Sequence, residues 1–300
     1  FRTKHSTVSS LIRFTDFCFE QIDKGNYIGM VALDLRKAFD TVNHQILLSK
    51  LKLYGFNDIC LNWFNSYLSG RTQLVSINDT LSKTEFVTCG VPQGSILGPL
   101  LFILYINDLT ACTKYCDINM FADDTMFYFA AKDINLVKSN LQTDLVNISE
   151  WLCANKLSLH IGKTNCMVVG SVKKVKNKNH ELNLMLNNEN VEQTDNVKYL
   201  GVHLDENLKF DEHVDKLIGK INRGLGILKR SSYVVEKDSL LTIYNTIILP
   251  HFDYCAVVWG SCNDTLLTRL QRLQNRAMRI ILKCPFRTHI STMLSNLNWM

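Results

Sequence analysis

Hydrophobic residues follow two alternating spacings along the first two thirds of the chain. In residues 5–23 they recur every three or four positions, as on one face of a helix. Residues 27–35 form a short apolar run that is typical of a buried strand. With glycines and turn residues as boundaries, the pattern predicts further helices at 43–54, 58–68, 95–107 and 135–153, and strands at 73–77, 85–91, 158–169 and 197–205.

Residues 118–129 carry the most informative pattern. Two apolar, β-prone runs flank Asp123 and Asp124, which predicts a hairpin with both carboxylates at its tip. From Phe210 onward the spacing is helical. We therefore expect a mixed helix and strand body up to about residue 205, followed by helices at 211–230, 237–248 and 265–283.

The composition excludes several classes of protein. The 300 residues are 46% hydrophobic and 20% charged, which permits a core and argues against disordered, collagen-like and coiled-coil chains. The net charge of +5 lies entirely within residues 261–300, where six basic residues accompany one acid. This block predicts an acidic partner or, alternatively, a solvated helix face.

The ten cysteines are scattered without a C-x-x-C pair, so we interpret them as reduced thiols of an intracellular protein. No signal peptide is recognisable, and the longest apolar run, residues 96–106, is too short to cross a bilayer. The chain begins with Phe1 rather than Met, and we therefore expect it to be a fragment or a processed piece.

Three acids lie within apolar strand sequence, namely Asp34, Asp123 and Asp124. A buried carboxylate is costly unless it is paired or bound to a metal. Any one of these residues could simply cap a turn. Together, at the ends of neighbouring strands, they predict a Mg²⁺ site at which substrate phosphates complete the coordination shell.

One segment resembles the end of a phosphate-binding loop but lacks the full pattern. Residues 160–164 end in Gly-Lys-Thr, but Leu157 stands where the full pattern requires glycine. We therefore do not interpret this segment as a nucleotide-hydrolase loop.

Four blocks, in this order, resemble one known family: VALDLRKAFDTVNH (31–44), GVPQGSILGPLLF (90–102), FADDT (121–125) and KYLGV (198–202). They are similar to the reverse transcriptases of non-LTR (LINE-type) retrotransposons, and within these to the jockey-like elements. The opening FRTKHST and the stretch 254–282 are similar as well, so the resemblance covers nearly the whole chain.

The resemblance implies an α+β fold of the right-hand polymerase type. It divides the chain into partial fingers (1–26), an antiparallel-sheet palm with inserted fingers helices (27–205) and a helical thumb (206–300). It implies that Asp34 and Asp123 bind two Mg²⁺ ions, with Mn²⁺ as a possible substitute, and that Asp124 has a lesser role. It also implies that the fingers begin upstream of Phe1.

Further roles follow from the resemblance. Phe39 matches the aromatic residue that excludes a ribose 2′-OH, although a lone Phe could also be core packing. Gln93 and Gly94 match the turn that faces the nucleotide and template base. Lys163 matches a lysine near the pyrophosphate leaving group, with a surface lysine as the alternative. Asp40 has no separate catalytic role.

The resemblance also names residues for nucleic acid. The segment from Tyr199 to Gly201 resembles the hairpin that grips the primer end, where Gly201 allows close approach of a backbone or simply makes a turn. Arg2 matches a fingers motif. One helical face carries Arg269, Arg272, Arg276, Arg279 and Lys283, beside an apolar stripe that can dock onto the body. A polyanion would relieve the repulsion among these cations.

The expected partners are therefore an RNA template, a DNA primer or target and dNTPs, with no membrane. The family implies a cytoplasmic ribonucleoprotein and the nucleus as locations. Two alternatives stay open: a catalytically impaired or co-opted nucleic-acid-binding relative, and a palm-like nucleotidyl cyclase, which would share paired acids on a hairpin but does not need the basic C-terminal block.

Overall fold

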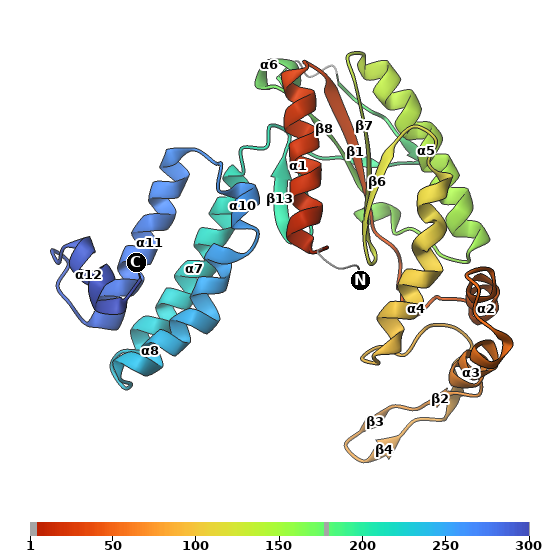
Figure 1. Ribbon diagram of the computed structural model, residues 1–300, viewed down its shortest axis with the longest axis horizontal. Helices are drawn as coiled ribbons and strands as arrows, with labels where there is room; N and C mark the ends of the chain where they lie inside the picture. Colours follow the sequence, from red (N-terminus) through yellow and green to blue (C-terminus); the bar gives the residue numbers. More distant parts are fainter. Residues whose placement is uncertain (1–4, 177–179, 300) are drawn as a thin grey trace. The chain divides into compact units, whose positions relative to one another are not determined.

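The computed structural model describes residues 5–176 and 180–299 of the chain (Figure 1). Their contacts group into two compact units. The first comprises His5 and Phe17–Val197, and the second comprises Ser6–Asp16 and residues 198–299. Helix α1 (Thr7–Asp23) therefore supplies residues to both units.

The first unit is built on a five-stranded sheet with the order β11-β8-β1-β7-β6. Its central strand β1 pairs antiparallel with β7 and β8, β6 pairs antiparallel with β7, and the edge strand β11 runs parallel to β8. The expected α+β class with a largely antiparallel sheet is confirmed. The strands are β1 (Tyr27–Leu33), β6 (Asp117–Phe121), β7 (Asp124–Ala131), β8 (Asn165–Val169) and β11 (Glu192–Gln193).

Both faces of this sheet are covered, which explains why β1 is apolar throughout. Helix α5 (Ile134–Ala154) runs along one face (Figure 1). A Cβ atom on Gly29 would lie 2.5 Å from the side chain of Val137, so glycine allows α5 to approach β1 closely. On the other face, Phe17 packs against Tyr128 with 4.9 Å between ring centroids.

The segment between β1 and β6 contains three α-helices near the positions expected from sequence. Asn43 and Asn57 cap two of its helices by accepting backbone N–H groups of Ile46 and Cys60. The hydroxyl of Ser95 accepts the N–H of Gly98 at the start of the third helix. The elements are α2 (His44–Leu53), α3 (Asp58–Leu68), α4 (Leu97–Ile106) and the 3₁₀-helix η1 (Asn107–Cys112).

The strands predicted at 73–77 and 85–91 are far shorter in the structure. This arm consists of two-residue ladders, β2 with β5 and β3 with β4. Its apolar side chains are exposed, so their alternation does not mark a strand face buried on a core. The strands are β2 (Thr72–Gln73), β3 (Ser76–Ile77), β4 (Thr80–Leu81) and β5 (Glu85–Phe86).

The strand predicted at 158–169 is also only partly correct. Residues Ile161–Lys163 form a short 3₁₀-helix, η2, and β8 begins at Asn165. The hydroxyl of Thr164 donates to the carbonyl of His160 at 3.2 Å, which favours a turn over extended backbone. The smaller elements that follow are α6 (Val172–Val175), β9 (Met185–Leu186) and β10 (Glu189–Asn190).

Two buried polar groups hold the helical layer in place. The carboxylate of Asp144, which is fully buried, accepts the backbone N–H groups of Lys114, Tyr115 and Cys116 at 2.7–2.8 Å and so fixes the entry to β6. Burial raises the pKa of Asp144, but these hydrogen bonds outweigh it and the net pKa is lowered. Lys50 donates to the Tyr105 carbonyl at 2.7 Å.

Besides residues 6–16, the second unit contains most of a hairpin, which begins at Asn196, and the helices that follow it. The long helix α7 packs against α11, and Gly224 of α7 lets Ile248 approach, because a Cβ there would lie 2.8 Å from its side chain. The helix predicted at 237–248 continues to Asp253 through a π-helical turn, η3. The elements are β12 (Asn196–Tyr199), β13 (Val202–Asp205), α7 (Asp211–Ser231), α8 (Lys237–Ile243), η3 (Tyr244–Ile248), α9 (Leu249–Asp253), α10 (Ala256–Trp259), α11 (Asp264–Leu282) and α12 (Ile290–Leu297).

None of the helices in the described part of the chain has the length and apolar character needed to cross a membrane. All ten cysteines fall within the described residues, and all are free thiols.

Candidate active site

The strand register brings three acids to one end of the sheet. Strand β1 ends at Leu33, which is paired with Thr125 of the antiparallel strand β7. The residue after Leu33 is Asp34 and the residue before Thr125 is Asp124, so the register brings these two acids to the same end of the sheet. The β6–β7 hairpin closes on the pair Phe121 and Asp124, with Asp123 in its turn. The hairpin predicted from sequence is therefore present, with both aspartates at its tip.

A turn from the β8 side holds the backbone of Asp34. The N–H of His160 donates to the Asp34 carbonyl at 2.8 Å, and the Asp34 N–H donates to the hydroxyl of Thr164 at 3.4 Å. These bonds orient the carboxylate, whose oxygen lies 4.0 Å from the Nζ of Lys163. Both side chains are substantially exposed, at 44% and 63%, so the contact is worth little in stability. Sequence reasoning assigned no role to His160 or Thr164.

These acids suit a hard cation that shares its coordination shell with a substrate. Asp123 and Asp124 are exposed and Asp34 is half exposed, so their oxygens can reach a ligand. Within residues 5–176 and 180–299, no group of three or more His, Cys, Asp or Glu side chains is close enough to enclose a metal. A Mg²⁺ ion bound at these acids would need phosphates and water to complete its coordination shell.

The Pro92–Gly94 turn is joined to the loop after β1. The N–H of Val91 donates to the Phe39 carbonyl at 2.9 Å. The side-chain amide of Gln93 donates to the Asp40 carboxylate at 2.8 Å. A Cβ on Gly90 would lie 2.7 Å from the Asp40 carbonyl, so glycine is needed for this approach. Asp40, to which sequence reasoning gave no role, therefore positions Gln93.

Phe39 and Gly94 differ in how firmly they are held. The Phe39 ring stacks on Phe102 of α4 with 4.5 Å between centroids and 30° between planes, which anchors a half-buried side chain on the core. Gly94 has φ +78°, and a Cβ there would meet no described atom within 4 Å. The turn thus needs glycine for its backbone conformation, and the space beside Gly94 can admit a ligand.

The Tyr199–Gly201 segment is a tight hairpin turn in the second unit. Leu200 and Gly201 both have positive φ, 45° and 81°, as in a type I′ turn. The hydroxyl of Tyr254 donates to the Leu200 carbonyl at 2.8 Å, and a Cβ on Gly201 would lie 3.1 Å from the Tyr254 ring. Tyr199 is only 3% exposed, so its ring is buried, whereas the neighbouring Lys198 is exposed. The geometry favours the simple turn for Gly201.

The basic face of α11 is partly used within its own unit. Arg269 forms an ion pair with Asp215 of α7 at 2.6 Å. The guanidinium of Arg279 donates to the Phe286 and Asn275 carbonyls at 3.0 and 3.2 Å. Arg272 and Arg276 are exposed, as is Lys283, which ends the helix. The apolar stripe contributes Leu270 and Ala277 to the buried core of a unit in which α11 packs against α7.

Arg2, which sequence reasoning related to a fingers motif, lies outside the described residues.

Two known proteins that are similar to this chain come from mobile elements of Drosophila. A protein from transposon BS of Drosophila melanogaster, described as a probable RNA-directed DNA polymerase, is 28% identical over 99% of this chain and 34% of its own length. The RNA-directed DNA polymerase from mobile element jockey of Drosophila funebris is 30% identical over 95% of this chain and 32% of its own length. The chain thus spans about a third of the length of these relatives.

Solved structures add a distant likeness. Telomerase from Candida albicans, in complex with a fragment of telomeric RNA, aligns over 98% of this chain and 51% of that chain at 11% identity, with a TM-score of 0.47.

The sequence model of the family described as reverse transcriptase (RNA-dependent DNA polymerase) matches residues 1–204. This span contains every acid at the end of the sheet, the Pro92–Gly94 turn and the lysine beside Asp34. The chain therefore belongs to the reverse transcriptase family.

Proposed function

We propose that this chain is the catalytic part of an RNA-directed DNA polymerase of a non-LTR, jockey-like retrotransposon. It would add deoxynucleotides to the 3′-OH of a DNA primer on an RNA template. The observation that carries the proposal is the register of β1, β7 and β6, which brings Asp34, Asp123 and Asp124 to one end of the sheet in a chain of this family.

Asp34 and Asp123 would hold Mg²⁺, with Mn²⁺ as a possible substitute, and Asp124 would support the hairpin turn. Bound metal would lower the pKa of the primer hydroxyl and neutralise charge on the transferred phosphate. Lys163, 4.0 Å from Asp34, adds a positive charge beside the expected path of the leaving pyrophosphate. The bonds from His160 and to Thr164 keep the Asp34 backbone in place during this transfer.

The loop after β1 would select the nucleotide. Phe39, whose ring stacks on Phe102, would exclude a ribose 2′-OH by its bulk. Gln93, held by Asp40, offers an amide carbonyl to the nucleotide or template base. Gly94 lets a ligand approach the backbone of the turn.

The second unit would hold nucleic acid. The hairpin around Tyr199 and Gly201 would contact the primer end through its backbone and through Lys198, since the Tyr199 ring is buried. On α11, Arg272 and Arg276 are the exposed candidates for phosphate contacts, with Lys283 at the helix end. Arg269 and Arg279 would serve mainly to hold the helix.

In this proposal residues 1–26 are the last part of the fingers, 27–205 the palm and 206–300 the thumb. The family places such polymerases in a cytoplasmic ribonucleoprotein and in the nucleus. A catalytically impaired or co-opted nucleic-acid-binding relative is the alternative, and the exposed acids at the hairpin tip favour an active enzyme because such a relative would not need them.

Primer extension on an RNA template with Mg²⁺ tests the proposal. The protein as it stands, and a longer version extended upstream, should both be assayed. Asp123→Asn should abolish nucleotide addition while leaving template–primer binding intact. Asp117→Asn, an exposed acid at the other end of β6, is the matched control and should stay active. Binding of template–primer by the longer protein without any extension would refute the polymerase and support the co-opted relative.

A further inference from the structure

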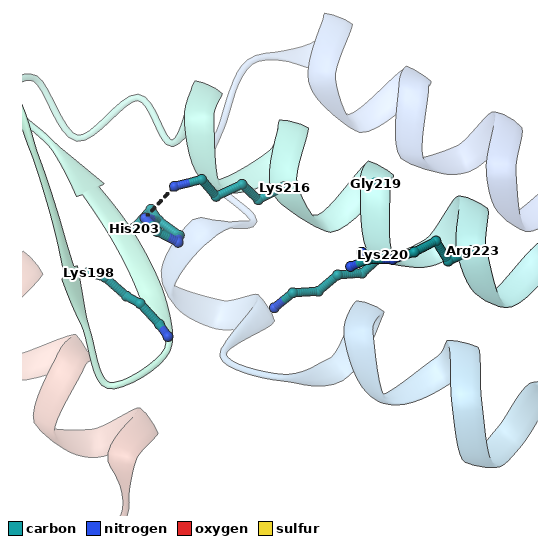
Figure 2. A pocket seen from close by; sticks show the side chains of 6 residues that line it. All are labelled: Lys198, His203, Lys216, Gly219, Lys220 and Arg223. Carbon is teal, nitrogen blue, oxygen red and sulfur yellow. Dashed lines mark hydrogen bonds between the residues drawn. The ribbon is translucent and has the colours of Figure 1, made fainter.

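A basic hollow lies in the second unit, between the β12–β13 hairpin and α7. Its volume is about 320 Å³. Figure 2 shows side chains of the hairpin and of successive turns of α7 around it. The lining residues are Lys198, His203, Lys216, Gly219, Lys220 and Arg223.

The lining contains three lysines, one arginine, one histidine and no acid. Lys216, Lys220 and Arg223 are spaced by four and three residues, so they share one face of α7. Gly219 opens space on that face, because a Cβ there would meet no described atom within 4 Å. Outside the lining, Glu212 pairs with Lys216 at 2.5 Å, which leaves a strong positive excess.

Such an arrangement is unfavourable by itself. Like charges three or four residues apart destabilise a helix, and the hairpin adds Lys198 on the other side. A solvated helix face would not require cations from two separate elements to line the same hollow. The positive charge of this cluster also acts on His251 of α9. Burial is the largest cause that lowers the pKa of His251, and Lys220 and Arg223 lower it further.

The histidine is held in one orientation. The ammonium of Lys216, which can only donate, lies 3.2 Å from Nδ1 of His203, so Nε2 carries the proton of the neutral ring (Figure 2). The backbone N–H of His203 donates to Nδ1 of His213 at 3.3 Å, and the buried His213 ring packs 5.8 Å from Trp259. His203 is therefore held by two residues of α7, one at its ring and one at its backbone, and is not a loose surface side chain.

We propose that this hollow is a phosphate-binding pocket that takes one phosphate group of a nucleic-acid strand. Lys198, Lys220 and Arg223 would bind its oxygens, and His203 would complete the lining. The pocket goes beyond the polymerase chemistry proposed above and rests on that proposal only for the source of the phosphate. A free polyphosphate offers the same chemistry, and the experiment distinguishes the two sources.

Occupancy should be coupled to proton uptake. Burial lowers the pKa of His203, and Lys216, Lys198 and Lys220 lower it further, while Glu212 opposes them; the neighbouring His213, whose pKa is lowered to about 4, stays neutral near pH 7. A bound phosphate would offset the cations and raise the pKa of His203. Binding therefore takes up a proton, and the affinity should increase as the pH falls from about 8 to about 6.

The test measures binding of the whole chain to a short RNA–DNA duplex in EDTA, so that neither metal nor catalysis contributes. Lys220→Gln combined with Arg223→Gln should weaken binding about tenfold. The salt slope should fall by about one. Lys229→Gln, an exposed lysine of α7 outside the lining, is the matched control and should change neither quantity by as much.

Inorganic pyrophosphate serves as the second probe. If it competes with the duplex only in the wild-type chain and the Lys229→Gln variant, the pocket is confirmed for strand phosphate. Binding of pyrophosphate without a change in duplex affinity would overturn the strand as the source. Equal binding of both probes to all variants would overturn the pocket. Because no nucleotide is added in this assay, an inactive polymerase does not affect the outcome.

His203→Gln tests the proton coupling separately with the duplex, whose phosphodiesters do not titrate in this range. The wild-type affinity should rise several-fold between about pH 8 and pH 6, and the variant should show a flat profile. An unchanged pH dependence in His203→Gln would remove His203 from the pocket.

Discussion

The side-chain amide of Gln93 donates a 2.8 Å hydrogen bond to the carboxylate of Asp40. The two residues are 53 positions apart and belong to separate sequence blocks, yet this bond and the close approach of Gly90 to the Asp40 backbone join them. Asp40 thereby gains a positioning role, because it determines which way the Gln93 amide points.

We predict that Asp40→Ala raises KM for the incoming dNTP or lowers base selectivity, with a smaller effect on kcat. Both side chains are exposed, so the loss in stability should stay below about 1 kcal/mol. Steady-state primer extension gives both constants. Asp40→Asn retains an acceptor oxygen for Gln93 and should recover most of the wild-type KM; if Asp40→Ala behaves like wild type, Asp40 does not position Gln93.

Phe39 should control discrimination between deoxy- and ribonucleotides. Its ring stacks on Phe102, and Phe39→Val removes the bulk of that ring. We expect ribonucleotide incorporation to rise by about tenfold or more, as measured by competing dNTP and rNTP on the same template. Phe39→Tyr keeps the bulk and should keep the selectivity. A Phe39→Val enzyme with unchanged discrimination would assign Phe39 to core packing.

Gly201 and Tyr254 should be coupled in stability. The substitution Gly201→Ala would place a Cβ-bearing residue at a positive φ, which is strained. Its Cβ would also lie too close to the Tyr254 ring. We expect a loss of about 1–3 kcal/mol in the free energy of unfolding, measured by chemical denaturation. Gly55→Ala, with φ +87° but open space around the site, isolates the cost of the backbone conformation. Equal losses in the two variants would mean that the Tyr254 contact contributes nothing.

The carboxylate of Asp144 should make the free energy of unfolding depend on pH in the acid range. Its folded pKa is lowered, so its contribution is fully present above the unfolded value of about 4 and is lost as the pH falls through the folded value. Asp144→Asn should destabilise the chain by about 2–4 kcal/mol at neutral pH, because an amide opposes some of the three N–H donors. It should also flatten the dependence of stability on pH in the acid range.

Denaturation curves between about pH 3 and pH 7 measure both effects of the Asp144 substitution. Asp133→Asn, at the N-cap of the same helix, is the control, because Asn caps a helix as well as Asp does. Stability of Asp144→Asn equal to that of the control would contradict the structural role.

The exposed part of the α11 face should contribute to nucleic-acid binding. Arg272→Gln combined with Arg276→Gln should weaken duplex binding and reduce its salt slope by up to about two. Arg269→Gln, which breaks the ion pair with Asp215, should affect the slope less and stability more. Binding titrations at several salt concentrations measure this slope. An unchanged salt slope would mean that this face of α11 is only solvated and does not contact nucleic acid.

Local sequence patterns were sufficient for much of this molecule. Apolar spacing located α1, α5, α7 and α11 within a few residues, because a helix that buries one face must repeat its apolar positions. The acids of the β6–β7 turn were recognisable because carboxylates inside apolar strands are costly. The arm between β2 and β5 was misjudged, because alternation alone does not reveal whether a core is available to cover it.

The sequence by itself determined the elements, the order of the family blocks and the acids at strand ends, since these depend on neighbours a few residues apart. Only the tertiary structure decided that Asp40 holds Gln93, that Tyr199 is buried, that Arg269 is committed to Asp215, and that Lys198 and His203 join the cations of α7 around one hollow. Each of these depends on contacts between segments distant in the chain. Local spacing cannot encode such contacts, because they arise when the strands register and the helices pack.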